Sequence, residues 1–243
     1  MYEDFSYIYD KLSFDLDYKG YAKNILELVE KYNIKKENML ELAAGSGMLT
    51  NYFFEEFENI DALDISPDML NVFAKKYDND NVNLIYYDMV EFENPGKYDL
   101  IVILLDSINY VTDPKELQKL FDNCYKNLKE NGLLVFDINS EYKIKEIFGS
   151  NCYVYEYEDI FYSWDNFYED DLVDMHLNFF VENEDGSYNR IYEYQQERLY
   201  RVGEVKKMLE KSGFVDVKTY DEDDFGKVRE DSQRILFSAV KEN

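Results

Sequence analysis

Three acidic side chains stand where successive strands of this chain are expected to end. Glu41 lies near the end of the first apolar segment, Asp64 closes the second, and Asp88 follows the third. Parallel strands end at one edge of their sheet, so we expect the three carboxyl groups to lie close together. Acidic residues occupy 52 of the 243 positions, and one such match is therefore weak evidence. Their joint placement is what indicates a binding site.

A short loop with two glycines, Gly45-Ser46-Gly47, follows the first of these segments. Glycine lets the backbone turn sharply and lets a ligand approach the amides, and the helix expected to begin there would offer unpaired N–H groups. The alternative is a tight turn between strand and helix. A dinucleotide-binding fingerprint needs a third glycine three residues after the second, where this chain has Thr50. An acid at position 41 favours a ligand with an ammonium group over a pyrophosphate.

The other two acids suit the remaining parts of a nucleoside. A carboxylate at Asp64, 17 residues beyond Gly47, can accept both hydroxyls of a ribose that lies across the sheet edge. Asp88 is placed to accept an adenine amino proton, with the apolar side chain of Met89 covering the ring. The three positions together predict a site for a ligand with an ammonium group, a ribose and an adenine.

The elements that must position these residues alternate between strand-like and helix-like segments, which predicts a parallel sheet with crossover helices. Strands are expected at 38–44, 60–65, 82–86, 98–105, 133–138, 214–220 and 234–241. Helices are expected at 21–32, after the glycine loop, from Pro67 behind the cap Ser66, from Pro114 behind Asp113 to about Lys129, and at 202–211. The predicted fold class is α/β, with a mostly parallel sheet.

Residues 140–200 show a different sequence pattern, in which polar and apolar residues alternate over long stretches. This pattern, with residues 153–164 as its first strand, predicts a three-stranded antiparallel insert. The α/β core is then formed by residues 1–139 and 201–243. One face of the insert is apolar, through Val173, Met175, Leu177, Phe179 and Val181. That face could roof the active-site edge or be buried in a dimer interface, and the roof is favoured because the insert begins at that edge. Trp164 and the tyrosines of the insert would either line a substrate wall or pack beneath the sheet.

Composition excludes several classes of function. The formal net charge of −26 opposes binding to nucleic acid and to anionic membranes. No apolar run approaches the roughly 20 residues that span a bilayer, and the N-terminus has no features of a signal peptide, so a cytoplasmic protein is expected. Two cysteines, Cys124 and Cys152, are too few for a disulfide framework, and the single His176 makes a histidine-based metal site or catalytic triad unexpected. We therefore expect no metal and a small-molecule partner, with the protein a monomer or a homodimer.

The motifs resemble those of class I S-adenosylmethionine-dependent methyltransferases. The resemblance is carried by Glu41-Leu-Ala-Ala-Gly-Ser-Gly47, Asp61-Ala-Leu-Asp64-Ile-Ser-Pro-Asp-Met-Leu70, Tyr87-Asp88-Met89, Leu105-Asp106-Ser107 and Asn131-Gly-Leu-Leu-Val-Phe-Asp-Ile138. Ala43 replaces the first glycine of many members. The opening Phe5-Ser-Tyr-Ile-Tyr9-Asp10 and the insert are similar to bacterial sugar-amine N,N-dimethyltransferases and to uncharacterised methyltransferases of Gram-positive bacteria. The family implies a Rossmann-like sheet of seven strands, the last of them antiparallel.

The resemblance also implies how the chain would bind S-adenosylmethionine. Glu41 would hold the methionine ammonium, and Asp64 the ribose hydroxyls. The other implied contacts are the backbone of Ala43, Gly45, Ser46 and Gly47 around methionine and ribose, Ile65 and Met69 on adenine, Asp88 at its amino group, Met89 at its ring, the Leu105 carbonyl near the methionine amine, and Tyr9 in a lid. Tyr9 could equally be a core tyrosine.

The expected activity is methyl transfer to a small polar acceptor, with an amine among the candidates. An amine must lose its proton before it attacks, and Asp106, just after the fourth strand, is the acid placed to accept it. Asp106 could instead cap a turn. The alternative function is a non-catalytic module that binds S-adenosylmethionine and regulates a partner. A nicotinamide-dependent oxidoreductase is disfavoured, because the third glycine and a Tyr/Lys or His catalytic pair are missing.

Overall fold

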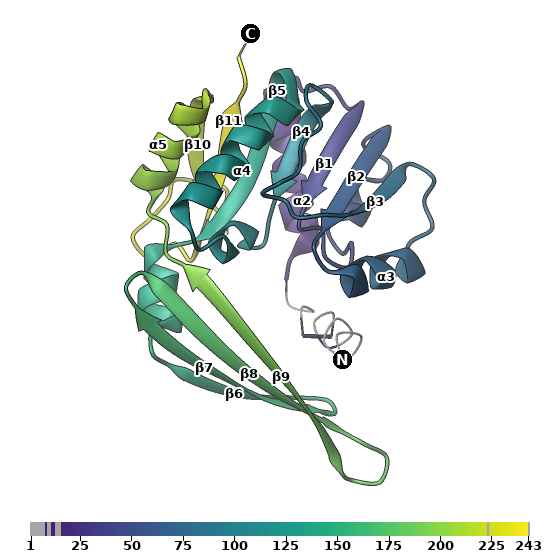
Figure 1. Ribbon diagram of the computed structural model, residues 1–243, viewed down its shortest axis with the longest axis vertical. Coiled ribbons are helices and arrows are strands. Elements are labelled where there is room, and N and C mark those ends of the chain that lie inside the picture. The colour runs from purple at the N-terminus through teal and green to yellow at the C-terminus, as the bar shows by residue number, and fades with distance from the viewer. Residues whose placement is uncertain (1–7, 9–10, 13–15, 223, 243) are drawn as a thin grey trace.

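A sheet of seven strands forms one half of the computed structural model, which describes residues 8, 11–12, 16–222 and 224–242 (Figure 1). Its strand order is β10-β11-β5-β4-β1-β2-β3. The strands are β1 (Asn38–Leu42), β2 (Asn59–Asp64), β3 (Val82–Tyr86), β4 (Tyr98–Ile103), β5 (Leu128–Asn139), β10 (Val215–Asp221) and β11 (Arg234–Val240). The order reverses direction between β1 and β4, so the carboxyl ends of these two strands flank the switch point of the sheet.

All strands of this sheet run parallel except one. β11 pairs antiparallel with both of its neighbours, β5 and β10. The pairs β1–β2, β1–β4, β2–β3 and β4–β5 are parallel. The interior strands are mostly apolar, as expected for a sheet covered on both faces, and every residue of β4 is buried. This arrangement is the mostly parallel seven-stranded sheet that the sequence predicted.

Helices cover both faces of the sheet. α2 (Tyr18–Lys31) and α3 (Pro67–Lys76) lie on one face, and α4 (Pro114–Asn127) and α5 (Val202–Ser212) lie on the other. The predicted caps of α3 and α4 are confirmed. Ser66 accepts a hydrogen bond from the amide of Met69, and Asp113 accepts one from the amide of Lys115. Each cap satisfies an amide that the first helical turn leaves unpaired, and each is followed by proline at the first helical position.

Two sequence expectations for this half were wrong. No α-helix follows the glycine loop, where the chain instead makes turns and a short 3-10 helix, η1 (Thr50–Phe53). The side-chain amide of Asn51 donates hydrogen bonds to the backbone carbonyls of Gly47 and Met48. These bonds compete with the regular hydrogen bonds of an α-helix. α4 also ends at Asn127 rather than near Lys129, because Leu128 already pairs with Tyr98 as the first residue of β5.

The insert forms a second, antiparallel sheet, with four strands rather than the predicted three. Its strands are β6 (Cys152–Tyr157), β7 (Ile160–Glu169), β8 (Leu172–Glu182) and β9 (Tyr188–Arg198), in sequential order. The segment expected to be one strand reverses at Glu158, which has a φ of 52°. The β7–β8 turn likewise has positive φ at Asp170 and Asp171. Both turns use acidic residues where Asn-Gly is the usual signal.

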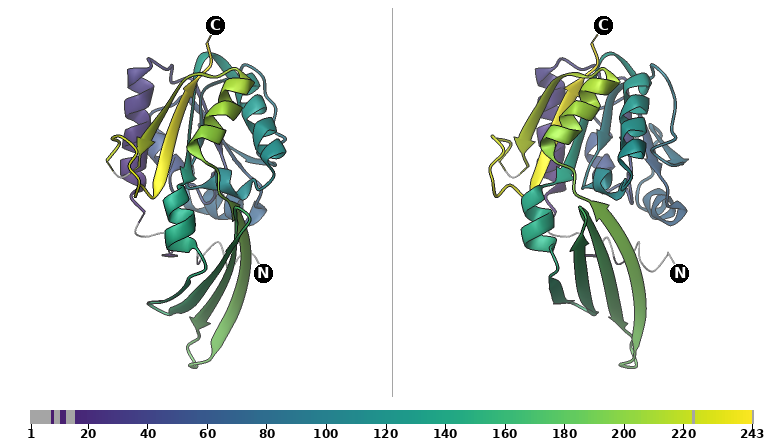
Figure 2. Two further views of the ribbon diagram at one scale, coloured as in Figure 1. Left: turned by 90° about the vertical axis from the view of Figure 1, so that its left-hand side faces the viewer. Right: turned by 60° about the vertical axis from the view of Figure 1, so that its left-hand side comes forward.

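The inner face of this second sheet packs on other parts of the chain. The π-helix η3 (Lys143–Phe148), which leaves the carboxyl end of β5, places Ile144 and Phe148 against Val173 and Met175. Ile8 from the N-terminal segment packs on Phe179 further along the sheet. The second sheet extends away from the carboxyl edge of the first, with η3 between them (Figure 2). The apolar face that the sequence placed on β8 is therefore covered by η3 and by Ile8.

Trp164 and His176 lie on opposite faces of the insert. Trp164 is on the inner face and packs against Phe148 and Tyr153, with ring centroids 5.2 Å and 6.1 Å away. His176 is on the outer face, where its Nδ1 is 2.7 Å from the hydroxyl of Tyr192. Tyr192 and Tyr194 share that outer face and are about half exposed. The tyrosines of β9 therefore point away from the carboxyl edge of the core.

Candidate functional site

The loop after β1 adopts left-handed backbone conformations at three residues. The φ angles are 57° at Ala43, 57° at Gly45 and 78° at Gly47. A Cβ atom at Gly47 would lie 2.7 Å from the ring of Phe73 in α3, so only glycine fits there. A Cβ at Gly45 would meet no atom within 4 Å. Gly47 thus lets the loop pack on α3, and Gly45 leaves open space beside the backbone.

Glu41 lies directly before this loop and is almost fully buried, with 4% of its surface exposed. Its Oε2 atom has no hydrogen-bond partner among the residues that the structure describes. Burial raises the pKa of Glu41 to about 8, with the nearby Thr50 hydroxyl opposing the rise and the carboxylate of Asp64 adding to it. A buried carboxyl oxygen without a partner is costly unless a ligand supplies one. The site therefore suits a cationic group that binds next to β1.

Asp64 joins the glycine loop to the beginning of α3. Its Oδ2 accepts a hydrogen bond from the Gly45 amide at 2.8 Å, and its Oδ1 accepts one from the Ser66 amide at 2.8 Å. The side chain is 8% exposed, and burial raises its pKa while the backbone hydrogen bonds lower it. Carboxylate oxygens have further lone pairs, so Asp64 can still accept hydrogen bonds from ligand hydroxyls.

The adjacent strand ends carry more exposed side chains. Ile65 is 63% exposed and Met69 is half-buried at the first turn of α3. Asp88 is exposed after β3, and its Oδ1 accepts the amide of Val90 at 2.8 Å. Met89 is partly buried against the core. These residues flank Asp64 at the same edge of the sheet, as the sequence predicted.

Leu105 and Asp106 follow β4, and both have left-handed backbone conformations, with φ of 56° and 57°. Their amides donate to the two carboxylate oxygens of Asp137 in β5, at 2.9 Å and 2.5 Å. Asp137 is completely buried, and burial raises its pKa to about 6 although Arg234 opposes the shift. The strained loop is therefore held by a side chain that comes from the neighbouring strand.

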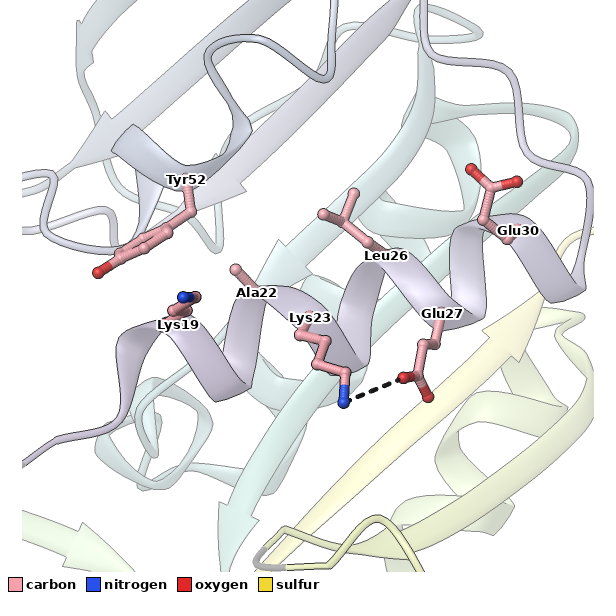
Figure 3. Close-up of a pocket in the computed structure, with 7 residues that line it drawn as sticks. All are labelled: Lys19, Ala22, Lys23, Leu26, Glu27, Glu30 and Tyr52. Atoms are coloured by element: carbon pink, nitrogen blue, oxygen red, sulfur yellow. Dashed lines mark ion pairs between the residues drawn. The ribbon is translucent and has the colours of Figure 1, made fainter.

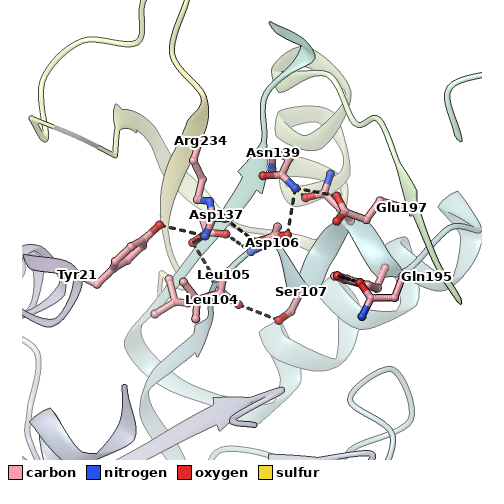
Figure 4. Close-up of polar contacts among 12 residues, drawn as sticks. Tyr21, Leu104, Leu105, Asp106, Ser107, Asp137, Asn139, Gln195, Glu197 and Arg234 are labelled. Carbon is pink, nitrogen blue, oxygen red and sulfur yellow. Dashed lines mark hydrogen bonds and ion pairs between the residues drawn. The ribbon is translucent and has the colours of Figure 1, made fainter. Parts of the chain in front are cut away.

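Asp106 stands at the N-terminus of the 3-10 turn that follows, but its side chain makes no capping hydrogen bond there, the alternative role that the sequence left open. Its Oδ1 pairs with Arg234 Nη2 at 2.7 Å, and its Oδ2 accepts Asn139 Nδ2 at 3.1 Å. Arg234 also donates to the hydroxyl of Tyr21 at 3.1 Å (Figure 4). Asp106 is thus fixed in orientation at the carboxyl edge by residues from β5 and β11.

Asn139 connects the core to the insert. Its Nδ2 donates to Glu197 Oε2 at 2.7 Å as well as to Asp106, as Figure 4 shows. Glu197 is 1% exposed, and burial, with Asp106 nearby, raises its pKa to about 8. Burial and Arg234 lower the pKa of Lys143, which is close to the same carboxyl groups. The junction of the two sheets is therefore a compact polar cluster of acids and bases.

Sequence reasoning missed Asn139 and four other members of this cluster. Asp137 interrupts the apolar run of β5, Arg234 begins β11, Glu197 is near the end of β9, and Lys143 follows β5. An acid within an apolar strand is the one local signal that was available. The predicted lid residue Tyr9 lies outside the described residues. No group of three or more His, Cys, Asp or Glu side chains in the described part of the chain is arranged to hold a metal ion.

A shallow groove lies elsewhere on the molecule, along the exposed side of α2 (Figure 3). It is lined by Lys19, Ala22, Lys23, Leu26, Glu27, Glu30 and Tyr52. Lys23 and Glu27 form an exposed ion pair there. None of the predicted site residues lines this groove, so it is separate from the carboxyl edge.

Sequence comparisons place the chain among methyltransferases. Residues 39–132 match a family model described as a methyltransferase domain. A methyltransferase-family protein of Geobacillus sp. (strain WCH70) is 30% identical over 99% of both chains. A dTDP-3-amino-3,4,6-trideoxy-alpha-D-glucopyranose N,N-dimethyltransferase of Streptomyces venezuelae is 28% identical over 56% of this chain and 58% of its own length.

Structural comparisons agree over the whole chain. The crystal structure of an S-adenosylmethionine-dependent methyltransferase from Clostridium acetobutylicum ATCC 824 has a TM-score of 0.89 and 33% identity, and covers 100% of this chain and 99% of its own. The sugar N-methyltransferase KedS8 from Streptoalloteichus sp. has a TM-score of 0.82 and 19% identity, covers 98% of this chain and 93% of its own, and shares the fold. Among the described residues, no helix is long and apolar enough to cross a membrane.

Proposed function

Because the chain belongs to the S-adenosylmethionine-dependent methyltransferases, we propose that it transfers the methyl group of S-adenosylmethionine to an amine of a small polar acceptor. Relatives named as amino-sugar N,N-dimethyltransferases support the amine. The acidic side chains at the carboxyl edge support it as well, because they favour a cationic partner over an anionic one.

The orphaned carboxyl oxygen of Glu41 is the observation that carries the proposed cofactor site. S-adenosylmethionine has an ammonium group on its methionine part, and this group would give the buried Oε2 the partner it lacks. The backbone at Ala43, Ser46 and Gly47, and the open space at Gly45, would surround the methionine and ribose. The residues at this end of β1 therefore fit the cofactor.

The nucleoside part of the cofactor would extend along the ends of β2 and β3. Asp64 would accept the ribose hydroxyls with lone pairs that the Gly45 and Ser66 amides leave free. Asp88 would accept from the adenine amino group. The apolar contacts to adenine would come from Ile65, Met69 and Met89, and the carbonyl of Leu105 would face the methionine amine.

Bound S-adenosylmethionine supplies a methyl group that its sulfonium charge already activates. The chain must therefore position the acceptor, exclude water and receive a proton. Asp106 is the proposed proton acceptor, since it follows β4 at the switch point and Arg234 and Asn139 fix its orientation. Each of its oxygens retains a lone pair for an amine proton. The insert, residues 140–200, is proposed to cover this edge and select the acceptor, while residues 1–139 and 201–243 hold the cofactor.

Calorimetry with S-adenosylhomocysteine, followed by an acceptor screen, tests this proposal. The screen would pair each amine with the alcohol of the same skeleton, such as glucosamine with glucose. We expect the enzyme to bind the cofactor product and to methylate amines while leaving the matched alcohols unchanged. Methylation of the alcohols at equal kcat/KM would contradict the amine assignment.

A further inference from the structure

The side chain of Asn139 lies between two carboxyl groups at the junction of the two sheets. Its Nδ2 donates to Asp106 Oδ2 at 3.1 Å and to Glu197 Oε2 at 2.7 Å (Figure 4). An amide nitrogen has two hydrogens, so each carboxyl group takes one of them. Glu197 belongs to β9, and the insert therefore shares a hydrogen-bond donor with the proposed proton acceptor.

A second asparagine connects the same three segments of the chain. Asn109 is completely buried in the 3-10 helix η2 (Ser107–Tyr110), which directly follows Asp106. Its backbone amide donates to the carbonyl of Asp106 at 2.8 Å, and its Oδ1 accepts the backbone amide of Asn139 at 2.9 Å. Its Nδ2 donates to the carbonyl of Arg198 in β9 at 2.9 Å. Both asparagines that contact Asp106 are therefore anchored to the end of β9.

The two carboxyl groups differ in their access to a cation. Asp106 pairs with Arg234 at 2.7 Å, whereas no ion pair among the described residues includes Glu197. The charged groups that face Glu197 are Asp106 after β4, Lys143 in η3 and Arg234 in β11, and β5 contributes the neutral amide of Asn139. Burial raises the pKa of Glu197 to about 8, and the charge of Asp106 adds to the rise. At neutral pH the proton of the pair is therefore on Glu197, and Asp106 is ionised.

We propose that Glu197 is a positioning residue for methyl transfer, which acts through Asn139 to hold the Asp106 carboxyl group in the orientation that accepts the proton of the amine. This inference rests on the proposed function and on Asp106 as its proton acceptor. Glu197 takes one hydrogen of the Asn139 amide, and this contact directs the other hydrogen to Asp106. The insert then contributes to proton transfer in addition to its proposed role of covering the edge.

The arrangement also predicts how the rate depends on pH. Above about pH 8, Glu197 loses its proton and places a second negative charge close to Asp106. That charge makes Asp106 a stronger proton acceptor. A residue that merely packs at the junction would change the rate by the same factor at every pH, so the pH dependence distinguishes a positioning role from packing.

The test compares two replacements of Glu197. Glu197→Gln keeps an oxygen for the Asn139 amide and has the charge of the protonated acid, whereas Glu197→Met keeps the bulk and offers only a weak acceptor. At about pH 6.5 we expect kcat to fall about 10- to 100-fold in Glu197→Met and less than about threefold in Glu197→Gln, with affinity for S-adenosylhomocysteine unchanged in both. Between about pH 6.5 and pH 9, the ratio of the wild-type kcat to that of Glu197→Gln should rise about 3- to 10-fold. Titration of the amine cancels in this ratio.

Glu193→Gln is the matched control. Glu193 lies on the same face of β9 and burial raises its pKa as well, but it is four residues away and is not bonded to Asn139. It should match the wild type at every pH. If Glu197→Met has the wild-type kcat, or if the kcat ratio is constant with pH, the role of Glu197 is wrong and the proposed function stands. If Asp106→Asn keeps full kcat, the inference fails together with the proton acceptor, while methyl transfer stands.

A measurement on the carboxyl groups decides if no member of the amine panel is methylated. Protein labelled with carbon-13 at the glutamate side-chain carboxyl would be titrated by NMR, and the Glu197 signal is the one that Glu197→Gln lacks. Asp106→Asn removes the charge close to Glu197, so the titration midpoint of Glu197 should fall by about one to two pH units. Asp80→Asn, at an exposed acid, should leave the midpoint in place. A midpoint that does not move in Asp106→Asn would show that the two groups do not interact, and would overturn the inference.

Discussion

Buried carboxyl groups lie in two regions of the carboxyl edge of the sheet, and the two regions differ in the hydrogen-bond partners that these groups have. At the ends of β1 and β2, Glu41 has an oxygen without a partner and Asp64 accepts backbone amides alone. At the ends of β4 and β5, Asp106 and Asp137 are surrounded by the side chains of Arg234 and Asn139 and by loop amides. The carboxylates of the first region leave atoms open for a ligand. Those of the second region have side-chain and amide partners within the protein, although the amide oxygen Oδ1 of Asn139 also lacks a hydrogen-bond partner among the described residues.

This difference separates two roles of acidic residues in one site. A carboxylate with internal partners stabilises a loop geometry before any ligand binds. A carboxylate without them makes the ligand-free fold less stable and gains hydrogen-bond partners only when a ligand binds. Substitutions in the two regions should therefore have effects of different kinds. Those near β5 should change folding first, and those near β1 should change binding first.

The largest expected effect follows from replacing Arg234 by Met. Removal of this arginine leaves Asp106 and Asp137 buried without their cation, which costs about 3–5 kcal/mol of unfolding free energy. Arg201→Met is the control, because Arg201 forms a comparable pair with Asp171 at 2.9 Å but is 45% exposed. The control should lose less than about 1 kcal/mol. Denaturant unfolding measures both, and equal losses would show that burial is not what distinguishes them.

Replacement of Asp64 by Ala should affect cofactor binding more than any other single change near β1. Two charge-assisted hydrogen bonds to the ribose are lost, each worth about 1.5–3 kcal/mol as an upper range, so affinity for S-adenosylhomocysteine should fall about 100-fold. Calorimetry on the folded variant measures this. Asp80→Ala, an exposed acid before β3, should bind like the wild type. Unchanged affinity in a folded Asp64→Ala variant would remove Asp64 from the site.

The sequence predicted one of these regions better than the other, for physical reasons. Glu41 and Asp64 could be predicted because the end of a strand is recognisable from the local sequence. Adjacent parallel strands end at the same edge of the sheet, so residues at those ends lie close together. The partners of Asp106 were missed because Arg234 is far along the chain and joins it only through the register of β11 on β5. The roles of these residues in binding and catalysis remain predictions.

The helices and strands likewise fall into those that the local sequence predicts and those that it does not. The capped helices α3 and α4 and the core strands were predicted from local periodicity and from Ser66 and Asp113. The insert was predicted with one strand too few, because the reversal at Glu158 uses an acidic residue with positive φ instead of the usual glycine or asparagine. Local sequence patterns do not show which distant segments pair in a sheet, or where a turn uses residues other than the usual ones.

Glu41→Gln should separate stability from binding. The pKa of Glu41 is about 8 in the folded protein against an ordinary value of 4.5, so the folded state retains a proton that the unfolded state releases between these values. The unfolding free energy of the wild type therefore falls as pH rises through this window. Glu41→Gln removes that loss, and should be more stable than the wild type at pH 8 by about 1–3 kcal/mol and similar to it near pH 4.5.

The same variant should bind the cofactor product less tightly. An ammonium ligand favours the ionised carboxyl group, so wild-type affinity for S-adenosylhomocysteine should increase as pH rises towards about 8, with release of a proton on binding. Glu41→Gln should lose about tenfold in affinity or more and show neither effect. Calorimetry in buffers of different ionisation enthalpy measures the proton release. A variant that is less stable and binds normally would make Glu41 a structural residue.

The smallest expected effect concerns Asp88, which has the same side chain as Asp64 at the next strand end but is exposed. One hydrogen bond in contact with water contributes about 0.5–1.5 kcal/mol, so Asp88→Ala should weaken binding of S-adenosylhomocysteine by tenfold at most. A second ligand makes this small effect specific. S-inosylhomocysteine has an oxygen in place of the adenine amino group and should repel the Asp88 carboxylate. The wild type should therefore prefer the adenine form, and Asp88→Ala should lose most of that preference. If the variant keeps the full preference for the adenine form, Asp88 does not contact the base. The smaller effect of Asp88→Ala than of Asp64→Ala would then not be due to exposure alone.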